Sequence, residues 1–227
     1  GGEENDEIFG LAVDAAGSAY VTGRTASDQT EGFPLVVGPD LTFNYGKNDV
    51  FVAKLKADGT GFVYSGYIGG SGTYDEYGRG IAVDAAGNAY VTGYTGSKEL
   101  HSFPVKVGPD LTFNGTAETD AFVAKVKADG TGLVYCGYIG GSGQDETYGI
   151  GIDAAGNAYV AGWTNSDETE GFPLLAGPDL TFNGFRDAFV ARVKADGTDR
   201  FGKPVRSQSG RRCPAGRPPS QAASLTR

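Results

Sequence analysis

The chain is built from one segment that occurs three times at an almost constant spacing. The heptapeptide Gly-Pro-Asp-Leu-Thr-Phe-Asn recurs at Gly38–Asn44, Gly108–Asn114 and Gly177–Asn183. A second motif, Asp-Ala-Ala-Gly followed by Ser or Asn, begins at Asp14, Asp84 and Asp153. A fixed period of about 70 residues indicates a repeat architecture, in which each unit buries its apolar surface against its neighbours.

Composition and charge restrict the classes of protein to consider. Gly accounts for 38 of the 227 residues and aromatic residues for 11%, which is typical of an all-β chain with many turns. The net charge is −9, but residues 1–197 carry 12 Lys/Arg against 27 Asp/Glu, a balance of −15. So acidic a surface repels phosphates and anionic lipids, and we expect no nucleic-acid partner. No apolar run reaches about 18 residues, so the sequence predicts no membrane span.

The second copy of the repeat shows the expected strands. Residues 80–84 and 89–95 flank a short turn with a glycine near its end, which predicts an antiparallel hairpin. Residues 120–127 alternate with period two, and an Asp-Gly turn separates them from a fourth apolar run at 133–139. Four antiparallel strands in series are typical of a β-propeller blade. In the long connection between the second and third strands, we expect Phe103, Val105, Leu111 and Phe113 to form a small separate cluster.

The order of these motifs resembles a known repeat. Gly-[Ile/Leu]-Ala-Val-Asp-Ala-Ala-Gly, a Phe-Pro loop, Asp-[Ala/Val]-Phe-Val-Ala-Lys and Leu-Val-Tyr-x-x-Tyr-Ile-Gly-Gly-Ser-Gly look like the SBBP repeat of bacterial seven-bladed β-propellers. The similarity to NHL repeats is weaker. The resemblance implies a propeller in a secreted or cell-surface protein, without an assigned activity.

The repeats divide the chain into four parts. We expect blades at residues 1–68 and 69–139, a truncated third blade at 140–198, and a basic tail rich in Pro, Arg and Ser at 199–227. The tail is predicted to be disordered, either as an out-of-frame translation or as a genuine basic extension. Because propellers close with four to eight blades, three blades predict an incomplete ring whose open edges favour self-association.

Acidic residues recur at three places in each repeat. An Asp-Glu pair precedes the first strand of every blade, at Asp6 and Glu7, Asp75 and Glu76, and Asp145 and Glu146. Such carboxylates in glycine-rich loops are calcium-ligand candidates, although local turn capping explains them better. The aspartates that open the first hairpin, and those that precede the third strand at Asp49, Asp120 and Asp187, are also interpreted as turn residues. Calcium is the one cofactor that the sequence suggests.

Arg24, Tyr94 and Trp163 occupy one equivalent position, directly after the Thr-Gly or Ala-Gly of the second strand. The two aromatic rings are candidates for stacking on a sugar, but packing between blades is the interpretation we favour. The only histidine, His101, lies in the long connection and is interpreted as a surface residue, like the variable charges Lys47 and Arg186.

No catalytic residue can be assigned from the sequence. Cys136 takes the place of Ser65 in the preceding copy, so this position requires a small residue rather than a reactive thiol. A unique site would have to use positions that differ between copies, and these hold no convergent acid–base set. We therefore expect a non-enzymatic scaffold or interaction module with a protein or glycan partner. The alternatives are a lectin-like propeller and a fragment of an NHL-like enzyme whose active site lies outside this chain.

Overall fold

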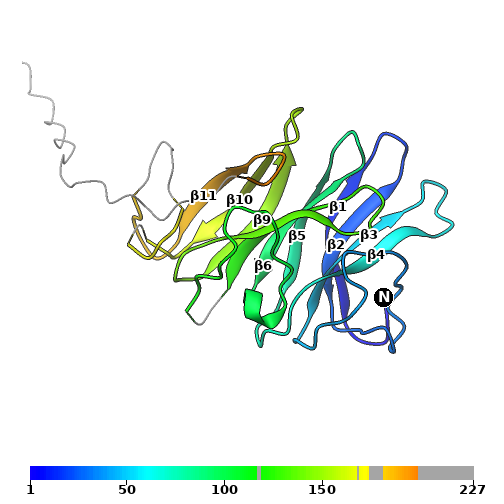
Figure 1. Cartoon of the computed structure of the whole chain (residues 1–227), viewed down its shortest axis with the longest axis horizontal. Helices are drawn as coiled ribbons and strands as arrows, with labels where there is room; N and C mark the ends of the chain where they lie inside the picture. The colour runs from blue at the N-terminus through cyan, green and yellow to red at the C-terminus, as the bar shows by residue number, and fades with distance from the viewer. Residues whose placement is uncertain (117–118, 168, 174–180, 199–227) are drawn as a thin grey trace, which may run out of the picture.

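The computed structural model describes residues 1–116, 119–167, 169–173 and 181–198. These residues form three separate antiparallel sheets, stacked side by side without closing into a ring (Figure 1). The first two sheets have four strands each, and the third has three, all paired in chain order or its reverse. The all-β propeller-blade fold predicted from the repeat is confirmed. The strands are β1 Asp6–Val13, β2 Ala19–Thr25, β3 Asp49–Leu55, β4 Phe62–Ile68, β5 Tyr77–Val83, β6 Ala89–Thr95, β7 Asp120–Val126, β8 Leu133–Ile139, β9 Asp145–Ile152, β10 Ala158–Thr164 and β11 Asp187–Val193.

The strand bounds in the second sheet agree closely with the sequence pattern. The second and fourth strands begin and end at the predicted residues, and the third is one residue shorter. The first strand, β5, begins at Tyr77 rather than Gly80. The reason is a β-bulge between Gly78 and Gly80, which lets the strand continue through a glycine-rich stretch that reads as a loop. A fourth strand of the third sheet would fall in residues 199–227, as would the predicted tail, outside the described residues.

The hairpin between the first and second strands of each sheet is built by its aspartate and glycine. Asp84 Oδ1 accepts hydrogen bonds from the backbone N–H groups of Ala86 and Asn88, at 3.0 and 2.9 Å. Gly87 has a φ of 84°, a left-handed conformation that favours glycine. The equivalent turns at Asp14 and Asp153 have the same bonds. The predicted turn role of these aspartates is thus confirmed.

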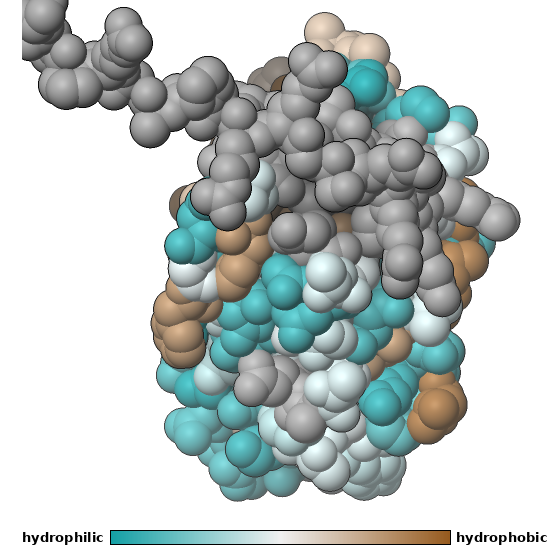
Figure 2. Space-filling model, turned by 90° about the vertical axis from the view of Figure 1, so that its left-hand side faces the viewer, coloured by the Kyte–Doolittle hydropathy of each residue, from teal (hydrophilic) through white to brown (hydrophobic). Residues whose placement is uncertain are grey.

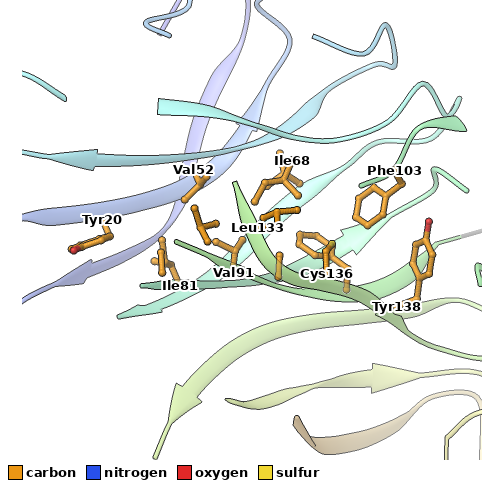
Figure 3. Packing of buried hydrophobic residues seen from close by; sticks show 14 of the residues in the cluster. Tyr20, Val52, Ile68, Ile81, Val91, Phe103, Leu133, Cys136 and Tyr138 are labelled. Atoms are coloured by element: carbon orange, nitrogen blue, oxygen red, sulfur yellow. The ribbon is translucent and has the colours of Figure 1, made fainter. Parts of the chain in front are cut away.

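The sheets pack face to face through apolar side chains. Tyr20, Val52 and Ile68 of the first sheet interdigitate with Val91 and Leu133 of the second, and all five are fully or almost fully buried (Figure 3). A second cluster joins the second sheet to the third. The first strands lie next to one another, since β5 packs against both β1 and β9, as the inner strands of consecutive propeller blades do.

The long connection between β6 and β7 belongs to the main core and not to a separate cluster. Phe103 and Phe113 are buried and pack on Tyr138, with ring centroids 5.2 and 5.6 Å apart. Val105 is partly buried against the same cluster, whereas Leu111 is exposed. The predicted satellite cluster is therefore wrong, because the connection folds back onto its own sheet and forms a bridge from Asp110 to Tyr138.

Among the described residues, no other sheet covers the outward face of the first sheet or of the third. On β1, Ile8, Leu11 and Val13 are exposed, and on β11 Val190 is exposed. Seen from the side of the third sheet, hydrophobic residues form separate patches among hydrophilic ones (Figure 2). None of the described residues forms a helix long and apolar enough to cross a membrane.

Candidate functional site

The variable loops gather at one end of the blades. Because neighbouring strands are antiparallel, every long connection lies at the end where β1, β5 and β9 begin, and the short hairpins lie at the opposite end (Figure 1). We call the first end the loop face. The described residues of the stretches that differ between copies belong to it: residues 26–32, 45–48, 96–102, 115–116, 119, 165–167, 169–171 and 184–186. The structure thus separates the residues shared by all blades from those free to carry function.

Each repeat places one strongly exposed apolar side chain on the loop face. Tyr45 is 79% exposed, Leu100 72% and Phe185 83%. Tyr45 has a φ of 63°, an uncommon conformation for a residue with a side chain, and Leu100 lies in a 3-10 turn at Glu99–His101. Exposed aromatic and aliphatic side chains of this kind are typical anchors of protein interfaces.

A second feature of the site is a row of side chains from the β-bulges of the inner strands. Each inner strand has one bulge residue that lacks a partner on the neighbouring strand: Phe9, Arg79 and Tyr148. The Arg79 guanidinium lies 4.4 Å from the ring centroid of Phe9 and 5.7 Å from that of Tyr148. A cation thus bridges two aromatic rings from the blades on either side. Bulges often re-aim side chains in this way near functional sites.

Tyr94, one of the two candidate sugar-stacking residues, is packed into this row. Its ring stacks on Tyr77 with centroids 4.9 Å apart, and its hydroxyl accepts a hydrogen bond from Arg79 at 3.2 Å. Only 9% of Tyr94 is exposed. Burial is the main reason that the pKa of its hydroxyl rises to about 12. The structure therefore places Tyr94 in contact with Tyr77 and Arg79 rather than in solvent.

Trp163, the other candidate, lies nearer to solvent. Its indole N–H donates to the Tyr148 hydroxyl at 3.1 Å, and the Arg186 guanidinium lies 3.7 Å from its ring centroid. Arg24, at the equivalent position of the first blade, pairs with Glu7 at 3.0 Å. Arg186, which the sequence suggested was only a surface charge, therefore covers the candidate ring. Lys47, the other variable charge, forms an ion pair with Asp75, with 3.7 Å between Nζ and Oδ2.

The Asp-Glu pairs do not occupy equivalent places in the three blades. Copy two has one extra residue between this pair and the bulge glycine, and strand pairing follows the glycine. As a result, one acid of each pair lies beside the threonine that ends the second strand. These acids are Asp6 beside Thr25, Glu76 beside Thr95 and Asp145 beside Thr164. Asp6 and Asp145 also accept a hydrogen bond from the serine two positions after that threonine. We call these three the blade-start carboxylates. In the first and third copies they are the first acid of the pair, and in the second copy the second acid.

The blade-start carboxylates hold the glycines that connect consecutive blades. Glu76 Oε2 accepts the backbone N–H of Gly70 at 3.1 Å, and Asp145 Oδ2 accepts that of Gly141 at 2.8 Å. Asp6 accepts that of Gly2 at 2.6 Å.

The member of each Asp-Glu pair that is not the blade-start carboxylate makes different contacts in each blade. Glu7 pairs with Arg24, Asp75 accepts a hydrogen bond from Asn48, and Glu146 accepts bonds from Tyr148 and Gln144. Among the described residues, no three His, Cys, Asp or Glu side chains lie close enough together to hold a metal ion.

The aspartates that begin the third strands meet the blade-start carboxylates of the next blade. Asp49 and Glu76 are both fully buried, and so are Asp120 and Asp145. Burial raises the pKa of Asp49 to about 7 and, together with the charge of Asp49, that of Glu76 to about 8. Burial also raises the pKa of Asp145 to about 6 and that of Asp120 well above its usual value.

This pairing of carboxyl groups between blades was missed in the sequence. The two partners are 27 residues apart in one junction and 25 in the other, on opposite sides of a hairpin. Asp49 and Asp120 do keep the predicted local role, since they accept the backbone N–H groups of Asn44 and Asn114 at 2.9 and 2.8 Å. The Asn of the heptapeptide motif thus fixes the aspartate that faces the next blade.

His101 is half-buried in a connection of the second blade, and Cys136 is buried in its core. His101 lies in the 3-10 turn, where its backbone carbonyl accepts the N–H of Ser71 at 2.8 Å. Cys136 is fully buried in the core, and burial strongly raises the pKa of its thiol.

Comparison with known families agrees with this geometry. A family model described as SBBP, beta-propeller repeat, matches residues 63–101 and 135–168. Both matches run from the fourth strand of one sheet through the first hairpin of the next, so they include a blade junction each. Two segments of the chain thus match the SBBP repeat. A search of curated proteins finds no relative of the chain. The residues that recur in all three copies include those of the hairpins and the Gly-Pro-Asp-Leu-Thr-Phe-Asn heptapeptide, whereas the rest of the long connections varies from copy to copy.

Proposed function

We propose that these SBBP blades form a non-enzymatic scaffold that binds a protein partner through the loop face, within a bacterial secreted or cell-surface protein. The observation that carries the proposal is the coincidence of two properties at one end of the blades. The loops there differ from copy to copy, and each repeat exposes one large apolar side chain there, at Tyr45, Leu100 and Phe185.

The opposite end of the blades varies much less between the copies. The opposite end consists of short hairpins with almost the same sequence in each blade, such as Lys-Ala-Asp-Gly-Thr at residues 56–60 and 127–131. These turns are fixed by their own aspartates, as shown by the bonds from Thr60 and Thr131 to Asp58 and Asp129. Selection for a stable turn explains these residues, whereas an apolar side chain that is mostly exposed buries little surface in its own blade.

The test is a binding experiment on the intact chain. The chain would be immobilised and exposed to a cell-envelope protein fraction from the bacterium that encodes it. The triple variant Tyr45→Ala, Leu100→Ala, Phe185→Ala should lose at least about tenfold in affinity for the retained protein, because each anchor contributes about 1 kcal/mol or more.

The matched control changes the same number of exposed residues at the hairpin end. Thr60→Ala, Thr131→Ala and Thr198→Ala occupy equivalent positions of the three blades and should leave binding unchanged. Equal binding by both triple variants would refute the assignment of the loop face.

A glycan is the second candidate partner, favoured only by Trp163. Its ring is partly exposed and is hydrogen-bonded to Tyr148, whose ring is exposed as well. A sugar could stack there if Arg186 moved from the indole face. Binding on a glycan array that is lost in Trp163→Ala but kept in Tyr94→Phe would support this candidate, and an array without any bound glycan would refute it.

A further inference from the structure

The two junctions between blades contain the same unusual arrangement of buried acids. At the first junction, Asp49 Oδ1 and Glu76 Oε2 lie 2.8 and 2.7 Å from the point where a Cβ on Gly69 would stand. At the second, Asp120 Oδ1 and Asp145 Oδ2 lie 3.1 and 2.8 Å from the equivalent point on Gly140. A glycine is needed here because the two carboxyl groups close around its Cα atom.

Each junction contains at least one buried carboxylate oxygen that lacks a hydrogen-bond donor among the described residues. Glu76 accepts from Thr95 and from the N–H of Gly70, and Asp49 Oδ2 accepts from Asn44. Asp49 Oδ1, which faces Glu76, is buried and has no hydrogen-bond partner among the described residues. At the second junction the same holds for Asp120 Oδ1, which faces Asp145, and also for Asp145 Oδ1. A buried oxygen without a donor costs about 1–3 kcal/mol, and more when it is charged.

We propose that each blade junction is a binding site for one proton, held between the third-strand aspartate of one blade and the blade-start carboxylate of the next. Protonated at Oδ1, Asp49 donates to Glu76 Oε2, and Asp120 donates in the same way to Asp145 Oδ2. One proton per junction gives the unpaired Oδ1 of the third-strand aspartate a partner, and it removes one of two like charges from a buried pair.

The groups around the first pair favour a proton over a metal ion. Asp49 is influenced by Asp40 and by the Asn44 amide, and Glu76 by Asp49, Thr95, Ser97 and Gly70, all of them acidic or neutral. Tyr67 also faces Asp49, and Cys136 and Tyr138 face Glu76; all three are neutral at ordinary pH. The neighbours that bond to the pair are N–H and O–H donors, which bind carboxylate oxygens. A calcium ion would instead require six to eight oxygen ligands.

The second pair has equivalent surroundings. Asp120 is influenced by Asn114, Gly115, Asp110 and Asp145, and Asp145 by Thr164, Gly141, Ser166 and Glu170. Tyr138 faces Asp120. No basic side chain is among the main causes of these pKa shifts, which favours a proton as the neutralising ion at both junctions.

The site makes the packing of the blades sensitive to pH. In the unfolded chain these carboxyl groups ionise near pH 4, whereas in the folded chain burial raises their pKa values, to about 8 for Glu76 and about 6 for Asp145. The folded state therefore binds more protons than the unfolded state in this window. Stability is highest in mild acid and falls as the pH rises, by about tenfold in the folding constant per pH unit for each proton held.

The test measures urea unfolding of the full chain from about pH 5 to about pH 9 in the presence of a chelator. We expect stability to fall across this range, and the double variant Asp49→Asn, Asp120→Asn to show a clearly flatter profile. An asparagine amide donates to the partner carboxylate as the protonated acid does, but it does not titrate. If this variant does not fold, Glu76→Gln with Asp145→Asn tests the same two sites from the other side.

A matched control separates the site from a general effect of charge. Asp58→Asn with Asp129→Asn removes two exposed turn carboxylates from the same blades and should keep the wild-type slope, because their pKa values are lowered by their turn hydrogen bonds. A flat wild-type profile, or a slope unchanged in both carboxamide variants, would overturn the proposal. Recovery of stability at about pH 8 on adding calcium alone would overturn it in favour of a metal site.

Discussion

Two equivalent residues, Ile81 and Leu11, allow the energy of blade stacking to be measured within one molecule. Both lie on the first strand of a blade, paired opposite Val91 and Val21 respectively. Ile81 is only 8% exposed because the neighbouring blade covers it, and its Cγ2 lies 3.2 Å from where a Cβ on Gly10 would stand. Leu11 is 65% exposed, since no described blade covers its face. The two positions differ mainly in this coverage.

Replacing each by alanine removes three carbon atoms. At about 0.8 kcal/mol for each buried carbon, Ile81→Ala loses about 2.4 kcal/mol, and the cavity that remains brings the loss to about 2–4 kcal/mol. For Leu11→Ala, with only about a third of the side chain buried, the same calculation gives about 0.8 kcal/mol. The expected difference of about 2 kcal/mol corresponds to about 4–8 °C in melting temperature for a chain of this size.

The assay is equilibrium unfolding in urea, with both variants and the parent at the same low protein concentration. Sedimentation at that concentration verifies that the chain does not self-associate through the face of Leu11. Equal losses of stability in the two variants would refute the reasoning, because they would mean that Ile81 is not covered by the first blade as the structure shows.

Two more comparisons use equivalent positions in the same way. The Tyr90 hydroxyl lies 3.1 Å from both Asp84 Oδ2 and the carbonyl of Gly156 in the next blade, so Tyr90→Phe should lose about 1–2 kcal/mol of unfolding free energy, whereas the exposed Tyr159→Phe should lose little. Ser65 and Cys136 are equivalent and buried, and the Ser65 hydroxyl has no hydrogen-bond partner among the described residues. Ser65→Cys should therefore raise the free energy of unfolding and Cys136→Ser should lower it, each by about 1–2 kcal/mol; melting temperatures that shift in the same direction in calorimetry would contradict this explanation.

The outcome for the junction acids shows why part of the site could not be predicted. The sequence aligns Asp75 with Asp6, because both begin an Asp-Glu pair. The strand register instead places Glu76 at the equivalent position, since the extra residue is accommodated before the bulge at Gly80. A motif read along the chain cannot show which of two neighbouring acids faces the interior, because successive residues of a strand point to opposite sides.

The two candidate sugar-stacking rings show a second limit to what the sequence can predict. Tyr94 and Trp163 are equivalent in sequence, yet one is buried under Arg79 and Tyr77 and the other lies near solvent under Arg186. Their exposure depends on side chains that pack over them from other parts of the same blade, Arg79 on Tyr94 and Arg186 on Trp163, and these residues differ between the copies.

The sequence alone determined the repeat, the hairpins and the strand pattern, because these follow from local features: alternating apolar residues, Asp-Gly turns and glycines with positive φ. The tertiary structure decided which residues meet across a blade junction. Asp49 and Glu76, like Asp120 and Asp145, are brought together only when one sheet packs on the next. Burial then changes their chemistry, since a carboxyl group removed from water retains a proton that it would lose in the unfolded chain.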